Sequence, residues 1–206
     1  APMIPPASKK KIGEKCVEAC RKMGYLGVGT FEFLYENEEF YFIEMNTRLQ
    51  VEHPVTEMIT GYDLVKHQIK VAAGEKIELL QKDINYNGHA IECRINAEHP
   101  KTFRPCPGKV TEWHMPGGPG VRVDSHVYNN YFVPPYYDSM IAKIIAHGKD
   151  RQEACGRMRI ALSEMVVEGI ETNLELHKDL LNDENFLKGG TSIHYLEEKL
   201  ENKKNN

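Results

Sequence analysis

Two glutamates occupy positions of a predicted β-hairpin where apolar residues are expected. Alternating apolar runs at residues 29–35 and 40–45 flank the polar residues 36–39, a pattern typical of two antiparallel strands joined by a tight turn. Glu32 lies inside the first run and Glu44 inside the second. A buried carboxylate must be neutralised, paired with a cation or bound to a metal, because its unpaired charge is costly to remove from water.

The two carboxylates would form a cation site if the strands bring them together. With an odd number of loop residues, Glu32 and Glu44 face each other across the hairpin, where two like charges repel. A divalent cation would relieve that repulsion, and Asn46, on the same strand face as Glu44, would add a neutral oxygen. Mg²⁺ and Mn²⁺ prefer such oxygens, with phosphate and water completing the shell. The alternative is an exposed polar face of an ordinary hairpin.

A polar row follows directly after these residues. In an extended segment, residues two apart point the same way, so Arg48, Gln50 and Glu52 would share one side. An arginine beside an amide and a carboxylate suits a small planar oxyanion, because the guanidinium binds it and the carboxylate can accept its proton. The alternative is a solvated loop with a surface ion pair. His53 precedes a proline and is interpreted as structural.

Together these motifs resemble those of biotin carboxylase, the ATP-grasp component of biotin-dependent carboxylases such as bacterial acetyl-CoA carboxylase. The resemblance covers nearly the whole chain, which makes it far more specific than one short motif. It rests on Glu32 and on the segments EMNTR (44–48), QVEHPVTE (50–57), GHAIECRINAE (88–98), PPYYDSM (134–140) and GTSIHYL (190–196).

The resemblance implies an ATP site in the hairpin and the C-terminal segment. Glu32, Glu44 and Asn46 would bind two Mg²⁺ or Mn²⁺ ions that bridge the phosphates of ATP, and both glutamates count among the ATP-binding residues. Leu34 and Ile193, which pattern alone interprets as core residues, would line the adenine pocket. That role would place the C-terminal segment against the hairpin.

The resemblance also implies the catalytic residues, namely Arg48, Glu52 and Arg94. Arg48 and Gln50, with the backbone N–H of Val51, would bind bicarbonate. Glu52 would deprotonate it for attack on the γ-phosphate of ATP, and the resulting carboxyphosphate would release CO₂ beside biotin. Arg94 would bind biotin and stabilise its enolate, because a guanidinium stays protonated and donates from a rigid fork. Without the resemblance, Arg94 is a charge on the solvent face of a strand.

Composition limits the classes of function. The chain has 206 residues, of which 41% are apolar and 27% charged, as in an ordinary globular protein. A net charge of −4 and no apolar run of about 20 residues argue against nucleic-acid and membrane partners. The five cysteines form no CxxC pair and the N-terminus lacks the layout of a signal peptide, so we expect free thiols and a cytoplasmic protein.

Periodicity predicts the elements that position these residues. Before the hairpin, a helix is expected from an N-cap at Ser8 to a stop at Gly24. After the polar row, Asp63 is expected to cap a helix that Gly74 stops. Residues 75–87 are polar and irregular and form the predicted linker.

The second half is predicted to contain more strands. Strands are expected at 88–97, 109–114, 120–127 and 139–147. A helix capped by Asp150 and Glu153 is expected to run to a stop at Gly169, and Thr172 is expected to cap the next helix. A short helix is expected at 195–200.

The predicted fold class is α+β. With the resemblance, residues 1–80 would be part of an ATP-grasp C-terminal lobe, made of an antiparallel hairpin plus helices. Residues 88–200 would be the biotin carboxylase C-terminal domain, β-rich with helices, and residues 201–206 a disordered tail. The chain begins Ala-Pro-Met and is interpreted as a piece of a longer protein, because the family's glycine-rich phosphate loop would precede it.

The resemblance implies ATP- and bicarbonate-dependent carboxylation of biotin on a carrier protein, the first half-reaction of acetyl-CoA carboxylase in fatty acid synthesis. Its partners would be ATP, bicarbonate, the biotin carboxyl carrier protein and the carboxyltransferase component. The full-length protein would be a homodimer, with Arg122 either in the subunit contact or exposed. The fragment alone is expected to be nearly inactive, and the final carboxyl acceptor is not encoded in this region.

Two alternatives stay open. Another ATP-grasp ligase, such as a carbamoyl-phosphate synthetase-like enzyme, could share the Glu…Glu-x-Asn pattern. Such an enzyme is not expected to combine Arg48, Gln50 and Glu52 with Arg94. The chain could also be a non-catalytic dimerisation or assembly module.

Overall fold

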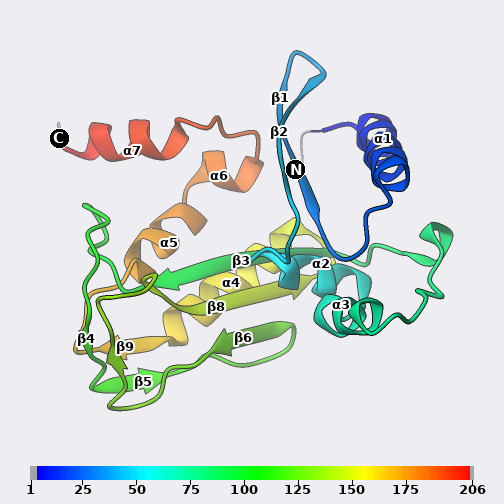
Figure 1. The fold of residues 1–206 in the computed structure, drawn as a ribbon. Coiled ribbons are helices and arrows are strands. Elements are labelled where there is room, and N and C mark those ends of the chain that lie inside the picture. Colours follow the sequence, from blue (N-terminus) through cyan, green and yellow to red (C-terminus); the bar gives the residue numbers. More distant parts are fainter. Residues whose placement is uncertain (1–3, 205–206) are drawn as a thin grey trace. The chain divides into compact units, whose positions relative to one another are not determined.

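The chain divides into two units at residue 86 in a computed structural model that describes residues 4–204 (Figure 1). In unit 1, up to Tyr86, the elements are α1 Pro6–Met23, β1 Thr30–Glu36, β2 Glu39–Asn46, α2 His53–Thr60, α3 Leu64–Ala72 and the 3₁₀ turn η1 Gln81–Asp83. The strands of unit 2 are β3 His89–Asn96, β4 Gly108–Lys109, β5 Glu112–His114, β6 Val121–Ser125, β7 Phe132–Val133, β8 Met140–Gly148 and β9 Val166–Glu168. Its helices are α4 Arg151–Glu164, α5 Leu174–Leu181, α6 Glu184–Lys188 and α7 Tyr195–Lys204. This mixture of helices and antiparallel strands confirms the predicted fold class.

The helices of unit 1 begin and end close to their predicted caps. Gly24 closes α1 in the left-handed conformation, at φ 63°, as predicted. The helix begins at Pro6 rather than after Ser8, because proline has the fixed φ that the first helical turn needs. Asp63 caps α3 as predicted, and its side chain accepts a hydrogen bond from the backbone N–H of Lys66 at 2.8 Å.

The hairpin pairs Glu32 with Glu44 by a different route from the predicted one. Its loop has two residues, Asn37 and Glu38, which adopt φ values of 50° and 65°, typical of a type I′ turn. An even loop alone would pair Glu32 with Ile43. A register shift next to Glu32 leaves Ile43 as an extra residue of β2, and Glu32 then faces Glu44. The condition of an odd loop is therefore not met, whereas the facing of the two carboxylates is confirmed.

Glu38 is the turn residue that glycine would replace favourably. Its left-handed backbone costs an L-residue about 1 kcal/mol, and glycine adopts the same conformation without that cost. We expect Glu38→Gly to stabilise the hairpin by up to about 1 kcal/mol, measured by amide hydrogen exchange of β1 and β2. Glu39→Gly, at a strand position, is the control and should speed exchange. Faster exchange in Glu38→Gly would contradict the turn geometry.

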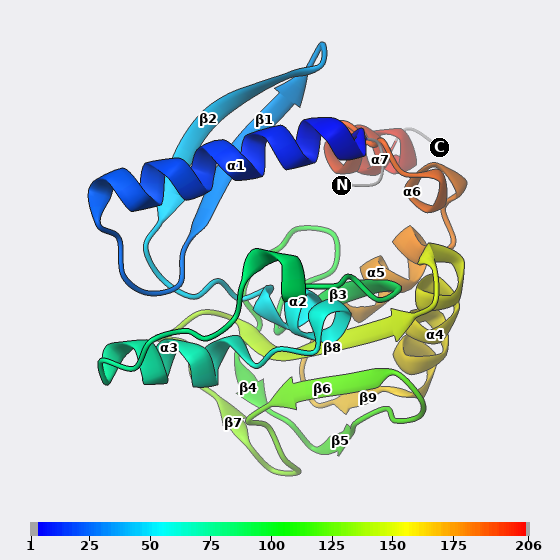
Figure 2. The same cartoon turned by 90° about the vertical axis from the view of Figure 1, so that its right-hand side faces the viewer.

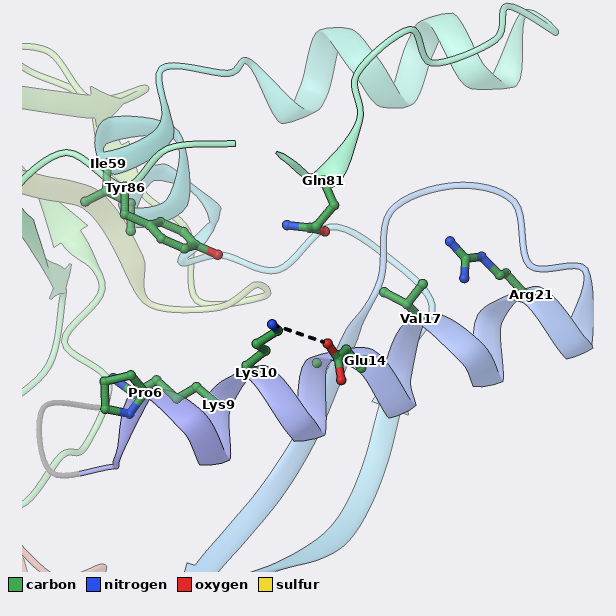
Figure 3. Close-up of a pocket in the computed structure, with 10 residues that line it drawn as sticks. Pro6, Lys9, Lys10, Glu14, Val17, Arg21, Ile59, Gln81 and Tyr86 are labelled. Carbon is green, nitrogen blue, oxygen red and sulfur yellow. Dashed lines mark ion pairs between the residues drawn. The ribbon is translucent and has the colours of Figure 1, made fainter. Parts of the chain in front are cut away.

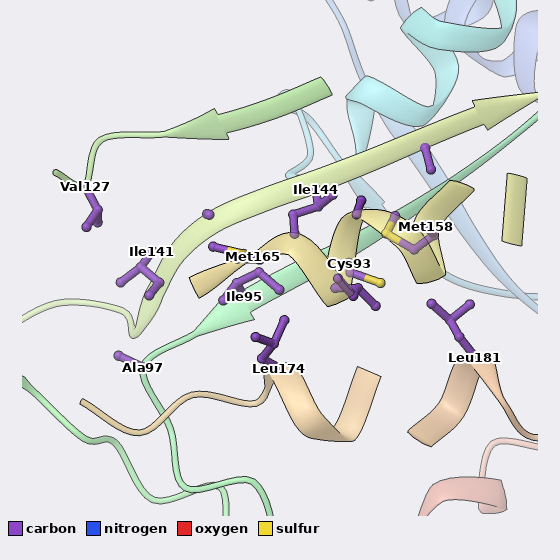
Figure 4. Close-up of a cluster of buried hydrophobic side chains, with 14 of the residues drawn as sticks. Cys93, Ile95, Ala97, Val127, Ile141, Ile144, Met158, Met165, Leu174 and Leu181 are labelled. Atoms are coloured by element: carbon purple, nitrogen blue, oxygen red, sulfur yellow. The ribbon is translucent and has the colours of Figure 1, made fainter. Parts of the chain in front are cut away.

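The core of unit 2 lies between a three-stranded antiparallel sheet, in the order β3-β8-β6, and helix α4 (Figure 2). Ile95 of β3 and Ile144 of β8 are fully buried, and Met158 and Leu162 of α4 belong to the same cluster (Figure 4). Because side chains alternate along a strand, the opposite face of this sheet carries the intervening residues. Arg94 lies on that opposite face, with its side chain 48% exposed.

Two boundaries in unit 2 differ from the prediction. Helix α4 ends at Glu164 and not near Gly169, because the β-branched residues that follow form β9, which pairs with β5. Gly169 comes after that strand at φ 93°. Asn173, rather than Thr172, is the N-cap residue of α5.

The predicted strand 109–114 and the predicted tail also differ. Two short strands replace the single one: β4 pairs with β7, whereas β5 pairs with β9, so the chain changes partner between them. Helix α7 extends to Lys204, so residues 201–204, expected to be disordered, are helical. The rest of the predicted tail, residues 205–206, lies outside the described residues.

Two expectations from composition can be compared with the structure. All five cysteines are free thiols, as predicted. Among the helices of residues 4–204, none has the length and apolar content that a membrane crossing requires.

Candidate functional site

Glu32 and Glu44 converge on one side-chain amide. Nδ2 of Asn46 donates to Oε1 of Glu32 at 2.8 Å and to Oε1 of Glu44 at 3.1 Å. Nε2 of Gln50 donates to the same Glu32 oxygen at 2.6 Å. The carboxylates therefore lie on one side of the hairpin, where like charges repel.

This set of donors fits a hard divalent cation. Two carboxylates and the amide of Asn46 converge, and a half-turn of that amide exchanges its nitrogen for its oxygen. Within residues 4–204, no group of three or more Asp, Glu, His or Cys side chains could hold a metal by itself. The protein thus offers part of a coordination shell, and phosphate oxygens and water would supply the rest.

The predicted polar row is only partly extended. Gln50 turns toward Glu32, whereas the Arg48 side chain is exposed and its Nη1 lies 3.4 Å from the carbonyl oxygen of Leu49. Glu52 has φ −82° and ψ 8° and is the N-cap residue of α2. The alternation of side chains expected for an extended segment therefore ends before Glu52. The proline at the second position of α2 favours this early helix start.

His53 supports the loop that carries Gln50, in agreement with the structural role expected for it. Its Nδ1 lies 2.7 Å from the carbonyl oxygen of Gln50, and its Nε2 lies 4.0 Å from Oε2 of Glu57. Glu57 also accepts a hydrogen bond from the backbone N–H of Leu64 at 2.7 Å, which ties α2 to the start of α3. The imidazole therefore fixes the backbone at Gln50.

Arg94 lies in a row of charges on the polar face of the unit 2 sheet. Its register partner on β8 is Lys143, which in turn faces Asp124 on β6. Nζ of Lys143 lies 3.3 Å from Asp124, and Nε of Arg94 lies 3.8 Å from the carboxylate of Glu92. Asp124 therefore partly neutralises the cation next to Arg94.

Arg122 completes this row through a two-pronged contact. Its Nε and Nη2 donate to the two carboxylate oxygens of Asp124 at 2.8 and 2.9 Å. Burial alone would raise the pKa of Asp124, but Arg122 and Lys143 outweigh it and hold that pKa below its usual value. The role of Arg122 in a subunit contact stays a prediction.

The residues expected to line an adenine pocket are exposed on their own units. The Leu34 side chain on β1 is 48% exposed, and Ile193, in the segment before α7, is 78% exposed. Their role with adenine stays a prediction.

A hollow of about 970 Å³ in unit 1 contains none of the predicted site residues (Figure 3). Its walls come from α1, α2 and the segment around η1, and an ion pair between Lys10 and Glu14, at 4.0 Å, lies on the α1 side (Figure 3). Both of these side chains are mostly exposed, and such pairs add little binding energy. The residues that line the hollow do not include Glu32, Glu44 or Asn46, so the hollow is separate from the carboxylate site.

Two families match the sequence. Residues 92–198, more than half of the chain, match the biotin carboxylase C-terminal domain. Residues 1–80 match the ATP-binding domain of the carbamoyl-phosphate synthase L chain. The second match covers the hairpin and its carboxylates.

Individual relatives agree with these matches. The chain is 64% identical over 200 residues to the biotin carboxylase of Haemophilus influenzae, and the match covers 97% of this chain and 45% of that protein. It is 60% identical over 200 residues to the biotin carboxylase of Pseudomonas aeruginosa, with 97% and 44% covered. The chain thus spans less than half the length of these curated relatives.

Solved structures show the same fold. The biotin carboxylase–β,γ-ATP complex of Campylobacter jejuni superposes with a TM-score of 0.93 at 44% identity, covering 96% of this chain and 44% of that one. The biotin carboxylase domain dimer of Hydrogenobacter thermophilus 2-oxoglutarate carboxylase, in complex with MgADP, ADP and bicarbonate, gives 0.92 at 45% identity, covering 95% and 44%. On the match over residues 92–198, this chain belongs to the biotin carboxylase family.

Proposed function

We propose that this chain supplies the C-terminal part of a biotin carboxylase. The full-length protein would convert ATP, bicarbonate and carrier-bound biotin into ADP, phosphate and carboxybiotin. The observation that carries the proposal is the convergence of Glu32 and Glu44 on Asn46, in a chain of this family. Facing carboxylates of this kind are costly without a cation, and ATP is used in cells as a complex with a divalent cation.

The hairpin carboxylates would bind the divalent ions of ATP. Glu32 and Glu44 would hold two Mg²⁺ or Mn²⁺ ions, with the Asn46 oxygen turned toward them. When bound, these ions would supply charge neutralisation at the γ-phosphoryl group. The amide of Gln50 already bonds Glu32, so it would keep that carboxylate in place.

The segment after the hairpin would bind and activate bicarbonate. Arg48 and the Gln50 amide, with the N–H of Val51, would orient the anion. Glu52 would take its proton as an oxygen of bicarbonate bonds to the γ-phosphorus and the bond to ADP breaks. The carboxyphosphate formed would then split into CO₂ and phosphate.

Arg94 would act on biotin. Loss of the ureido N–H proton places negative charge on the ureido oxygen, and a guanidinium stabilises it by donating hydrogen bonds. The half-exposed Arg94 side chain lies on the polar sheet face, outside the core cluster, which suits this role. Leu34 and Ile193 would cover the adenine of ATP.

Several finer properties belong to the same proposal. The full-length protein would be a cytoplasmic homodimer that works with a biotin carboxyl carrier protein and a carboxyltransferase component. The biotin carboxylase domain of the Hydrogenobacter relative is a dimer, which supports the proposed homodimer. Acetyl-CoA, for fatty acid synthesis, is the proposed acceptor, although one relative, 54% identical, is a pyruvate carboxylase subunit from Methanothermobacter thermautotrophicus.

The test is the dependence of phosphate release on bicarbonate and biotin in the full-length protein. Glu52→Gln should lower the bicarbonate-dependent rate about 10²-fold, because the base is lost, with Mg-ATP affinity unchanged. Glu38→Gln, an exposed change at the hairpin tip, is the matched control. The 206-residue chain alone should show little activity.

Other outcomes would decide against the proposal. An unchanged rate in Glu52→Gln would remove the base assignment. ATP consumption that needs bicarbonate and ammonia, but not biotin, would favour the carbamoyl-phosphate synthetase-like alternative that the match over residues 1–80 leaves open.

A further inference from the structure

The outer edge of β3 at Arg94 is bonded by side chains of α5 instead of by a strand. In the order β3-β8-β6, β3 is an edge strand, and its outward backbone groups need partners. Nδ2 of Asn173 donates to the carbonyl oxygen of Arg94 at 3.0 Å, and its Oδ1 accepts from the N–H of Asn96 at 2.9 Å. The backbone N–H of Asn173 donates to the carbonyl of Asn96 at 3.2 Å. Asn173 thus pairs with β3 as a residue of a neighbouring strand would.

The side chain of Asn173 makes these bonds instead of capping its own helix. Asparagine is among the best N-cap residues, and Asn173 is the N-cap residue of α5. Its side chain nevertheless makes no cap hydrogen bond. Asn173 is only 7% exposed, so its amide is committed to the strand 79 residues away.

His177 adds a second bond to the same carbonyl. Its Nε2 lies 2.8 Å from the carbonyl oxygen of Arg94 and must donate, because a carbonyl oxygen only accepts. Burial lowers the pKa of His177, and the hydrogen bond to Arg94 opposes this only in part, so the imidazole is neutral near pH 7. One turn of α5 therefore directs two donors at the backbone of Arg94.

The ladder between β3 and β8 is irregular next to Arg94, so the outer bonds of β3 matter more there. The register shifts between Ile95 and Asn96, where Ile141 of β8 is an extra residue, and such a bulge disrupts the ladder locally. Arg94 has a long side chain, half of it exposed, so the backbone that carries it largely determines where its guanidinium can reach.

We propose that Asn173 and His177 are positioning residues for Arg94: together they hold the edge-strand backbone from which its guanidinium projects. The proposal rests on the role proposed above for Arg94. Loosening this backbone should impair the step that uses biotin and spare the step that uses only ATP and bicarbonate.

The experiment compares two rates in the full-length protein: phosphate release with bicarbonate alone, and carboxylation of biotin. Asn173→Ala and His177→Ala should each lower kcat for biotin carboxylation about tenfold, because small misplacements of reacting groups are costly. Bicarbonate-dependent phosphate release and the KM for ATP should stay within about twofold. His177→Gln, which keeps a side-chain N–H donor, should recover much of the loss.

Two further variants separate the possible failures. Asn182→Ala is the matched control, because Asn182 also bonds a backbone carbonyl near the end of α5, that of Lys178 at 2.9 Å, and should change neither rate. Arg94→Ala must itself lower biotin carboxylation; if it does not, the role of Arg94 falls and this proposal with it. If Arg94→Ala lowers that rate while the Asn173 and His177 variants reduce both rates equally, these residues are merely structural and the proposal is overturned.

Discussion

Replacing both Glu32 and Glu44 with glutamine should reduce Mg²⁺-dependent phosphoryl transfer in the full-length protein on the order of 10³-fold, because several kcal/mol of charge stabilisation is lost. The same change should stabilise the hairpin when no metal is present, by up to about 1 kcal/mol. The two effects have opposite signs because the carboxylates that repel each other across the ladder are the proposed ligands. Ordinary surface glutamates would give only the small stabilising effect.

The hairpin contains its own control for this prediction. Glu36 and Glu39 also face each other, next to the two-residue turn, whereas the amide of Asn46 contacts Glu32 and Glu44. Changing both to glutamine should give the same small stabilisation and leave catalysis intact. Hydrogen exchange of the hairpin with and without MgCl₂, together with the rate at saturating Mg²⁺, measures both pairs. Equal losses of catalytic rate in the two double variants would show that Glu32 and Glu44 are not metal ligands.

The second large effect is expected in the core of unit 2. Ile95 is fully buried between Arg94 and Asn96, facing the cluster that includes Met158 (Figure 4). Ile95→Ala should lower the free energy of unfolding of this unit by about 3 kcal/mol, through lost burial and the cavity left behind. It should also lower biotin carboxylation, because β3 carries Arg94 on its other face.

Urea unfolding of the 206-residue chain, followed by tryptophan fluorescence, measures this effect. The single tryptophan of this chain, Trp113, lies on β5 in unit 2, so its fluorescence reports the unfolding of this unit. Ile160→Ala is the control: Ile160 lies on α4 but is 59% exposed, and its loss should shift the midpoint little. Unfolding midpoints that agree between the two variants would mean that Ile95 is not part of a tightly packed core.

The sequence predicted the parts of the fold that depend on local signals. The caps at Gly24, Asp63 and Asp150 were identified correctly, because each acts on its own helix terminus. The end of α4 was not, because the segment after it forms β9 by pairing with a strand more than 50 residues earlier. The β-branched residues Val166 and Val167 favour a strand, but they do not show which strand it pairs with.

The candidate site shows the same division. The carboxylates and Asn46 were predicted from alternation along two neighbouring strands, and the structure brings them together. Asn173 and His177 were missed, because nothing near them in sequence indicates a bond to Arg94. The one available signal was an asparagine immediately before a helix, which normally indicates a cap.

The bulge at Ile43 has a consequence for how this family can vary. Because the turn has an even number of residues, the additional residue of β2 is what places Glu32 opposite Glu44. If the turn became one residue longer, the two glutamates would stay opposite each other only if one residue were deleted from the strand. Insertions and deletions in this ribbon should therefore occur in compensating pairs, so that turn length and strand length evolve together.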